Sequence, residues 1–399
     1  MMAPAYRPAH PLADRRVLAL LGVFFCSGLA MGYFSPLLSA LMNDRGGSDP
    51  DLAVGAVSAV YYACAAAGAL WAGRRHLSIP RSLALGLASA GVLGAAAPFA
   101  PGIVGLAVAR AGCGFAVGMY ATVAQAALLA RTKERSRALI TGVQALAFAA
   151  GLASGPLVAM SLYDRSPVAA FLTGGGVLVV AGLAVLAWMQ PEWRGGEPAT
   201  KRAAARARLP FTAAFVYGFA EAVLLSVYPL ALLERNLPVS AVGMSCSAFV
   251  FGGVVSVLPV SIAADRLGRA RILLACACCG LVALLGLSVV DAPGPVIGFS
   301  FAVGASLGPL FAVALALVRD QFSEADLAWG TAGFMTTFNV GCIAGPVVSS
   351  IAMARYGAAS VFAPTLALLA FLVVQGVSRS GAVARRSDQG RTAMTRRAA

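Results

Sequence analysis

The chain has 399 residues, of which 59% are hydrophobic and 12% are charged, and its 30 Lys and Arg against 16 Asp and Glu give a net charge of +14. Globular proteins carry about a quarter charged residues, so this composition argues against a soluble protein and predicts an integral membrane protein. The positive charge would also suit a nucleic-acid-binding protein. The positions of the basic residues decide between these two readings.

Twelve apolar runs are long enough to cross about 30 Å of hydrocarbon as helices of roughly 20 residues. In chain order the expected spans are 17–42, 53–73, 83–100, 103–130, 138–162, 167–189, 210–233, 240–263, 271–290, 295–318, 328–353 and 360–377. The runs are continuous rather than alternating, so they predict helices and not the strands of a barrel. The first run is too long for the apolar region of a signal peptide, and we expect it to be a retained helix.

The expected spans divide the chain into five parts. They are an N-terminal segment 1–16, a six-helix bundle 17–189, a polar linker 190–209, a second six-helix bundle 210–377 and a basic tail 378–399. The predicted fold class is therefore an all-α membrane protein made of two six-helix bundles.

Three short matches indicate that the second bundle is a copy of the first. The stretch 151–156 (GLASGP) matches 341–346 (GCIAGP), Phe-Ala-Val-Gly at 115–118 recurs at 301–304, and Arg131 and Arg319 end corresponding runs. The offsets are 190, 186 and 188 residues. Transporters commonly carry such repeats.

Orientation follows from the basic residues. With the N-terminus placed inside, the inner segments hold 25 Lys and Arg residues, and the outer loops hold Arg45, Arg165, Arg235 and Arg355. Positive charge collects on the cytoplasmic side of membrane proteins. The sequence thus predicts that both termini are cytoplasmic, and the nucleic-acid reading is set aside.

Residues for catalysis, metal binding or nucleotide binding are sparse. The eight cysteines lie in apolar runs without the spacing of a metal site, and we expect them to be small core residues. Neither Lys133 nor Lys201 follows glycine, so no G-x-x-x-x-G-K phosphate loop exists and an ATP-driven pump is excluded. We expect no metal and no cofactor. An intramembrane enzyme would lack histidine and acid pairs in the spans, and a receptor or structural role is a further alternative.

Glycine and proline recur at equivalent places in the fifth and eleventh expected spans. The residues are Gly151, Gly155, Pro156, Gly341, Gly345 and Pro346. Proline removes a backbone hydrogen bond and weakens a helix locally, which suits helices that bend as two bundles rock. The alternative for the glycines is close helix packing.

Between the eighth and ninth expected spans, 261–269 (SIAADRLGR) resembles the loop motif G-x-x-x-D-R-x-G-R of the major facilitator superfamily. Asp265, Arg266, Gly268 and Arg269 match that motif. The resemblance covers essentially the whole chain and implies transport by alternating access. It also implies that Asp265 and the nearby arginines hold helix ends together in one state and release them in the other. A short charged turn is the alternative.

Other stretches resemble this family in part. The first-half counterpart of the loop motif, 68–75, has Ala72 in place of the acid, and 110–118 resembles its R-x-x-x-G-x-x-x-G pattern. The stretch 151–156 resembles the fifth-helix motif of exporters, although Ala159 and Met160 replace the trailing glycines. The pattern is similar to that of bacterial drug or metabolite efflux members.

Two ionisable residues lie deep in apolar spans, where burial is costly unless the charge is paired or hydrated. They are Glu221 in the seventh span and Arg110 in the fourth. The resemblance implies that these two helices line a central cavity, so both charges are expected to face it; a local contact that fixes packing is the alternative. Further polar candidates for the cavity wall are Tyr33, Tyr120, Gln125, Gln144, Tyr217, Tyr228, Ser306 and Asn339.

The sequence therefore predicts a secondary active transporter, with proton-coupled export of a small organic compound as the first reading. A proton-coupled importer of a sugar or organic acid is the alternative. Glu221 is the expected proton-coupling residue, since no other acid lies deep in a span, and binding of a cationic substrate by the same residue is the alternative. We expect a monomer in the bacterial inner membrane whose partners are its substrate, protons and lipid.

Overall fold

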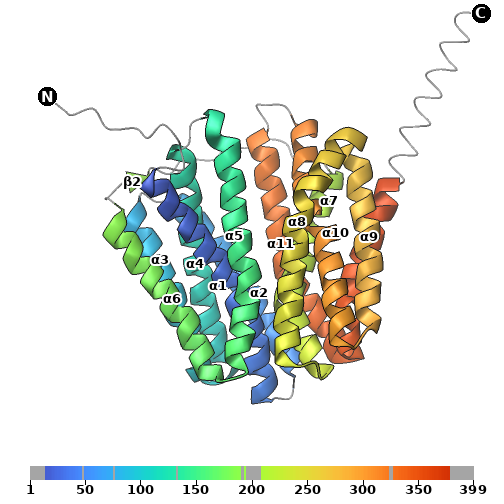
Figure 1. Ribbon diagram of the computed structural model, residues 1–399, viewed down its shortest axis with the longest axis horizontal. Coiled ribbons are helices and arrows are strands. Elements are labelled where there is room, and N and C mark those ends of the chain that lie inside the picture. Colours follow the sequence, from blue (N-terminus) through green and yellow to red (C-terminus); the bar gives the residue numbers. More distant parts are fainter. Residues whose placement is uncertain are drawn as a thin grey trace, which may run out of the picture.

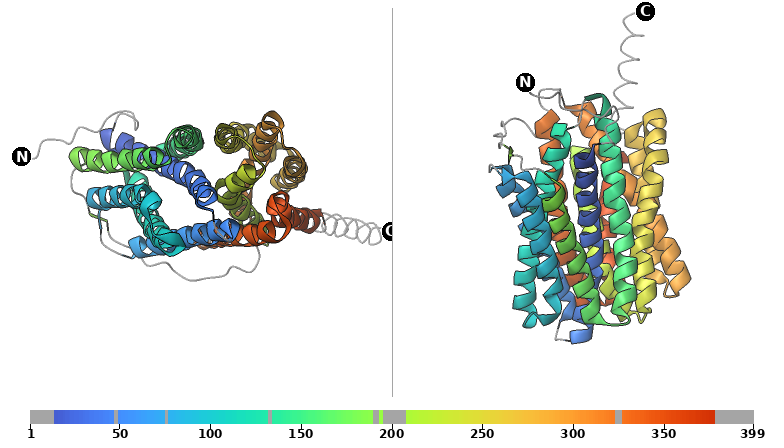
Figure 2. Two further views of the ribbon diagram at one scale, coloured as in Figure 1. Left: turned by 90° about the horizontal axis from the view of Figure 1, so that it is seen from below. Right: turned by 60° about the vertical axis from the view of Figure 1, so that its left-hand side comes forward.

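The computed structural model describes residues 14–46, 49–74, 77–131, 134–189, 193–194, 208–322 and 327–377. Within them, long helices run side by side in two groups, which Figure 2 shows next to each other in the view along the helices. We call the end of the molecule at which the first helix begins the Arg15 face, and the opposite end the Arg45 face. Successive helices run alternately between the two faces (Figure 1).

The first group contains six helices. They are α1 (Arg15–Arg45), α2 (Pro50–Gly73), α3 (Ile79–Ala95), α4 (Gly102–Arg131), α5 (Glu134–Tyr163) and α6 (Pro167–Trp188). A 3-10 turn, η2 (Ala97–Phe99), follows α3. Two short strands, β1 (Leu77–Ser78) and β2 (Trp193–Arg194), pair antiparallel and join the connection before α3 to the segment after α6.

The second group repeats this plan. It contains α7 (Arg208–Glu234), α8 (Val239–Leu267), α9 (Arg269–Val289), α10 (Pro293–Gln321), α11 (Leu327–Tyr356) and, after the 3-10 turn η3 (Ala358–Phe362), a terminal helix over residues 363–377. Eleven helical spans of the described chain are long and apolar enough to cross a membrane, and α3, with 17 residues, is shorter. The all-α fold class of twelve helices is confirmed.

Two expected boundaries differ from the structure. The third helix was expected over 83–100 but runs earlier, because Pro80 sits in its first turn and the helix ends before Pro98. The expected linker 190–209 includes β2, and its last two residues already belong to α7. The expected division of the chain into five parts stays a prediction.

Helix ends follow local chemistry. The Asp14 side chain accepts a hydrogen bond from the backbone N–H of Arg16 at 2.9 Å, which caps α1. Proline begins α2, α6 and α10, where its missing N–H costs nothing. Gly268 joins α8 to α9 with φ of +100°, a backbone conformation that favours glycine. The glycine of the loop motif therefore has a conformational reason.

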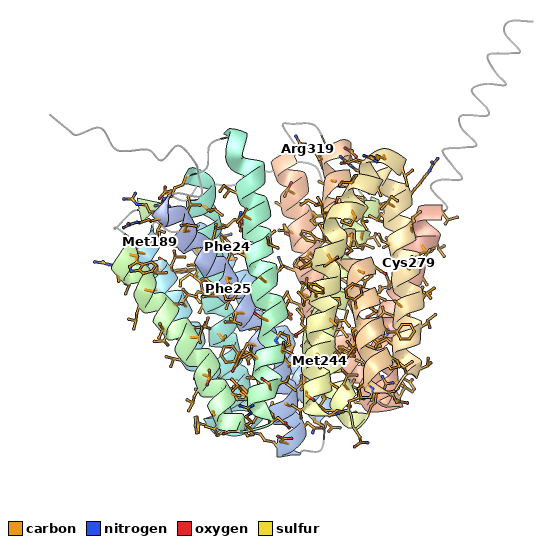
Figure 3. All side chains as sticks on the ribbon, in the orientation of Figure 1. Phe24, Phe25, Met189, Met244, Cys279 and Arg319 are labelled. Carbon is orange, nitrogen blue, oxygen red and sulfur yellow. The ribbon has the colours of Figure 1, made fainter. Side chains whose placement is uncertain are left out.

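Large apolar side chains cover the outside of the helices, as the sticks in Figure 3 show. Val104 and Val289 are each 77% exposed, and Leu258 is 70% exposed. Water would not tolerate so much exposed apolar surface on a monomer, whereas hydrocarbon would. The chain is thus a multi-pass membrane protein, and its exposed apolar side chains face lipid.

Close helix contacts are duplicated between the two groups. Gly118 in α4 packs against the backbone of Ala65 in α2, and Gly304 in α10 packs in the same way against Phe249 in α8. Gly151 in α5 packs on α1, and its counterpart Gly341 in α11 packs on α7. The structure therefore gives the glycines the close-packing role that small residues have between membrane helices. Both α5 and α11 continue through their prolines.

Each group also carries an arginine at the end of its first helix that binds the end of its third helix. Arg45 donates to the carbonyl oxygens of Ala97 and Pro98, the latter at 2.6 Å. Arg235 pairs with Asp291 and donates to carbonyl oxygens at the end of α9. A cation at a helix C-terminus satisfies carbonyl groups that have no partner within the helix. We call these two contacts the arginine staples.

Candidate functional site

A cavity of about 590 Å³ lies between the two groups of helices. Its wall is formed by α5 on one side and by α7, α8 and α10 on the other. The α8 residues of the wall run from Phe249 to Ser261, which places the cavity between mid-depth and the Arg15 face. Nearly all of the wall is apolar, so the few polar side chains in it determine what it can bind.

Glu221 is the polar group at the deepest part of this wall. It is the central residue of the 27-residue helix α7, about 20 Å from either helix end. Among the described residues, no ion pair or hydrogen bond of its carboxyl group is found. A half-buried carboxyl group that opens on a cavity can take up a proton or bind a cationic group.

An aromatic cluster lies beside Glu221. Tyr217, one helical turn away, stacks on Phe338 with ring centroids 5.9 Å apart and lies 5.6 Å from the ring of Phe311. Phe334 completes the cluster by contacting Phe311 at 5.2 Å. The pair of Tyr217 and Glu221 thus presents an aromatic face and a carboxyl group to the same cavity.

Arg110 does not line this cavity, which differs from the expectation that both deep charges face it. Its side chain is 5% exposed and its guanidinium lies 4.3 Å from the ring centroid of Tyr61 in α2. Cation–π contact stabilises a charge that has little water around it. The neighbouring Tyr62 lies within electrostatic range of both Arg110 and Glu221, and its buried hydroxyl has no hydrogen-bond partner among the described residues.

The other polar candidates, apart from Tyr217, lie in helix contacts rather than in the cavity wall. Tyr33 donates to the carbonyl oxygen of Ala170, and Tyr228 shares a hydrogen bond of 2.7 Å with Ser300. Tyr120 is fully buried. Gln144 donates to Gln125 at 2.5 Å, whereas Ser306 and Asn339 donate to carbonyl oxygens of their own helices. Most of these side chains bond to a nearby group because a hydroxyl or amide among apolar helices needs a local partner, and Asn339 does so although it is exposed.

The loop motif forms a charged cluster at the Arg15 face. Arg269 donates to Asp265 at 2.9 Å and to Asp320 at 2.6 Å, and it also contacts the carbonyl oxygen of Ala316. Arg319 lies at the same end of the molecule (Figure 3). The cluster joins the ends of α8, α9 and α10, all within the second group. The gating role of Asp265, Arg266, Gly268 and Arg269 stays a prediction.

The two groups touch tightly at the Arg45 face. Gly55 in α2 lies against Pro346 and Ser350 in α11, and Gly243 in α8 lies against Pro156 and Met160 in α5. The Ser39 hydroxyl in α1 donates to the carbonyl oxygen of Ser226 in α7. The structure is therefore closed at the Arg45 face, while its central cavity extends toward the Arg15 face.

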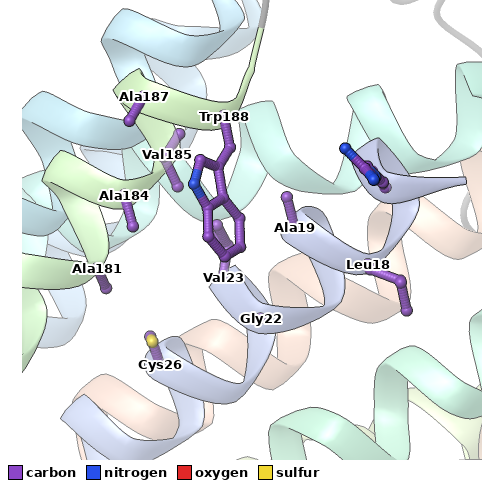
Figure 4. Close-up of a pocket in the computed structure, with 11 residues that line it drawn as sticks. Leu18, Ala19, Gly22, Val23, Cys26, Ala181, Ala184, Val185, Ala187 and Trp188 are labelled. Atoms are coloured by element: carbon purple, nitrogen blue, oxygen red, sulfur yellow. The ribbon is translucent and has the colours of Figure 1, made fainter.

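A second hollow, of about 660 Å³, lies between the first turns of α1 and the last turns of α6. Figure 4 shows Trp188 lying across it, opposite Ala19 and Val23. Among the described residues, Arg15 is the one charged residue in its wall, and Trp188 is 80% exposed. The hollow involves helices of one group alone, so the cavity around Glu221 is the better candidate for a transport site.

Sequence reasoning missed several residues of these sites. Tyr61 and Tyr62 were identifiable from the sequence, because two adjacent aromatic residues with hydroxyl groups stand in an otherwise apolar run. Asp320 also carried one, as the acid beside Arg319 at the end of its run. Phe311, Phe334 and Phe338 carried none, since a phenylalanine in a membrane span is an ordinary packing residue.

Comparison with known proteins gives a consistent result. The sequence profile described as Major Facilitator Superfamily matches residues 20–212 and again residues 210–392. An uncharacterised MFS-type transporter of Bacillus subtilis, YfkF, is 26% identical over 240 residues, which are 58% of this chain and 61% of that protein. One of Enterobacter sp. (strain 638) is 25% identical over 368 residues, 86% of this chain and 90% of that protein. The match to the Bacillus protein thus spans less than two thirds of its length.

Solved structures share the fold. A mutant of the nucleoside transporter NupG superposes with a TM-score of 0.76 at 14% identity, covering 91% of this chain and 99% of that one. A bacterial homologue of the human lysosomal transporter Spinster, in an inward-facing and unoccupied conformation, gives a TM-score of 0.71 at 13% identity over 91% of this chain and 95% of that one. At such identities the likeness concerns the fold alone.

Proposed function

Since the chain belongs to the Major Facilitator Superfamily and is a transporter, we propose that it exports a small organic compound in exchange for protons by alternating access. The observation that carries this proposal is the position of Glu221, whose carboxyl group stands at mid-membrane depth in the cavity between the two bundles. We propose that the Arg15 face is cytoplasmic. In that orientation the cavity receives its substrate from the cytoplasm.

The coupling follows from competition for one carboxyl group. A carboxylate in an apolar cavity is unstable unless it holds a proton or a partner, and the described residues of the cavity wall include no cation. Substrate arriving from the cytoplasm displaces the proton from Glu221, and the proton that enters from the other side displaces the substrate. Each exchange allows the protein to close one face and to open the other.

The cavity favours a substrate with an apolar or aromatic body. Tyr217 supplies an aromatic face, and Phe249, Val254 and Leu258 supply apolar surface. Binding of an organic acid, as in the importer alternative, would need a cation in the wall. Arg110 is stacked on Tyr61 inside the first bundle instead, so export of a neutral or cationic compound is the function that the geometry supports best.

Glu221→Gln tests this proposal in proteoliposomes. Glutamine keeps the size and hydrogen bonding of the side chain but cannot titrate, so the variant should lose transport driven by a proton gradient while it still exchanges substrate for substrate. Glu221→Asp, which keeps a titratable group, is the matched control and should retain gradient-driven transport. Uphill transport by Glu221→Gln with an unchanged response to the gradient would refute the coupling role.

Location and assembly belong to the same proposal. Arg15, Arg16, Arg74 and Arg81 lie at the Arg15 face, as do the arginines around the loop motif, whereas Arg45, Arg165, Arg235 and Arg355 lie at the Arg45 face. This distribution supports cytoplasmic termini and a bacterial inner membrane. The cavity is built by one chain, so a monomer suffices for transport.

A further inference from the structure

Two carboxyl groups meet across the two bundles at the Arg45 face. Asp51 is the second residue of α2, Glu234 is the last residue of α7, and their carboxyl groups lie within hydrogen-bonding reach of each other. Asp51 is only 9% exposed, and its Oδ1 atom has no hydrogen-bond partner in the part of the chain that the structure describes. Glu234 is exposed at the rim of the face. This contact therefore leaves a buried acceptor atom unpaired.

The contact between the two carboxyl groups depends on their protonation. Two ionised carboxylates are both acceptors and repel each other, whereas one shared proton turns them into a donor and an acceptor. The nearest arginines along the chain bind other groups. Arg45 binds the carbonyl oxygens of Ala97 and Pro98, and Arg235 pairs with Asp291.

Among the described residues, the other charged groups on the elements that pack against α2 and α7 do not neutralise the pair of Asp51 and Glu234. At this face, the elements that pack against α2 and α7, with the turns that flank them, carry Asp44, Arg45, Asp49, Arg235, Asp291 and Arg355. Asp44 accepts a hydrogen bond of 2.7 Å from Tyr163. Within the described part of the chain, none of the six forms an ion pair with Asp51 or Glu234. Since no cationic side chain of the described residues pairs with these two carboxyl groups, a shared proton is the charge that best compensates them.

We propose that Asp51 and Glu234 form a proton-binding site that closes the Arg45 face: the shared proton holds the ends of α2 and α7 together, and its loss drives them apart. A metal ion fits poorly, because the carboxyl groups touch directly and the described residues contain no group of three His, Cys, Asp or Glu side chains that could hold one. Since Glu234 is exposed, the proton exchanges with the solution at the Arg45 face. This site is separate from Glu221 and does not depend on it.

The test measures the width of the Arg45 face in the full-length protein in lipid nanodiscs. Spin labels are placed at Asp164→Cys, beyond α5, and Ser240→Cys, at the start of α8, both exposed and in different bundles. The background replaces the four cysteines that are not buried, Cys26, Cys64, Cys278 and Cys279, by serine. Acidic pH should give mainly the short distance, and alkaline pH should shift most molecules to a longer one.

Variants identify the titrating pair. In Asp51→Asn and in Glu234→Gln an amide N–H donates to the remaining carboxylate at every pH, so the short distance should persist at alkaline pH. Glu234→Lys should also keep the face closed, because an ammonium group pairs with Asp51. Asp44→Asn is the control. Asp44 has in the first repeat the position that Glu234 has in the second and lies at the same face, so this variant should retain the pH-dependent change in distance.

Three results would overturn the proposal. The first is a distance that ignores pH in the parent protein. The second is a pH response that survives in both Asp51→Asn and Glu234→Gln; if Glu221→Gln abolishes that response, the titrating group is the central carboxyl group and the proposed function stands without this site. The third is closure that follows sodium concentration at constant pH, which would identify a metal cation as the ligand.

Discussion

Gly55 in α2 packs directly against the carbonyl oxygen of Pro346 in α11. A Cβ atom at Gly55 would lie 2.7 Å from that oxygen, and one at Gly243 would lie 2.9 Å from the carbonyl oxygen of Pro156. These two contacts occupy equivalent places in the duplicated halves and join opposite bundles. The prolines of the repeated glycine and proline motif are thus at the closed interface, where the proposed alternating access requires the bundles to separate.

A larger side chain at either glycine should prevent the Arg45 face from closing. We expect Gly55→Val and Gly243→Val to shift the equilibrium toward the conformation open at this face, since overpacking costs ~1–3 kcal/mol, on the order of tenfold or more in population. The distance between spin labels at Asp164→Cys and Ser240→Cys measures the opening. Gly176→Val, at an exposed glycine with nothing within 4 Å of an added Cβ, is the control. An unchanged distance in both glycine variants would contradict the closed interface described above.

The charged cluster at the Arg15 face predicts unequal effects for its members. Arg269 holds both Asp265 and Asp320, so Arg269→Gln removes two ion pairs, whereas Asp265→Asn leaves the second. We expect both variants to fold and to interconvert more slowly between the two conformations, with the arginine variant slower. The Asp265 and Asp320 side chains are 64% and 50% exposed, so each ion pair contributes about 0.2–1 kcal/mol. Single-turnover transport rates measure the effect, and a larger loss in Asp265→Asn would exclude this arrangement.

Tyr217 should determine substrate affinity through its ring. Tyr217→Leu removes the ring that Tyr217 presents to the cavity, and since an aromatic pair contributes about 0.5–1.5 kcal/mol, we expect affinity for an aromatic substrate to fall by roughly threefold to tenfold. Tyr217→Phe keeps the ring and should bind substrate as the parent protein does. Binding to purified protein, followed by quenching of intrinsic fluorescence, checks both. Equal losses in the two variants would assign the effect to the hydroxyl group instead.

The orientation can be checked on intact cells. Asp164 and Arg266 are both exposed and lie at opposite faces. A membrane-impermeant thiol reagent should modify Asp164→Cys and spare Arg266→Cys until the cells are opened. Both sites should react in detergent, which controls for reactivity. Labelling of position 266 alone in intact cells would invert the proposed topology.

Periodicity, length and charge made the fold predictable from the sequence. Apolar runs of membrane length predicted the helices, and Arg131 and Arg319 at the ends of corresponding runs indicated the repeat. Glu221 was identifiable because a lone acid in an apolar span is costly, and the structure places it in the cavity wall. Gly268 stood out through its motif and has the backbone conformation that a glycine allows.

Contacts between distant helices were not predictable. Asp51 and Glu234 lie at the ends of two different spans, where acids are common, and nothing local indicates that they meet. The position of Arg110 was unpredictable for a related reason. Its helix was expected to face the cavity, but the side chain turned toward Tyr61 because an aromatic face was the partner within reach. The rotation of a helix about its own axis depends on its neighbours, and a single apolar sequence hardly specifies it.

The arginine staples have a consequence for how this chain can be assembled. Each staple closes within its own half, as do the glycine contacts between α2 and α4 and between α8 and α10. Residues 195–207, between β2 and α7, lie outside the described residues. Two separately synthesised polypeptides, divided within that stretch, would each carry a full set of internal contacts and would meet through the complementary surfaces of α1 with α7, α2 with α11 and α5 with α8. The covalent connection then acts mainly by raising the local concentration of one half near the other.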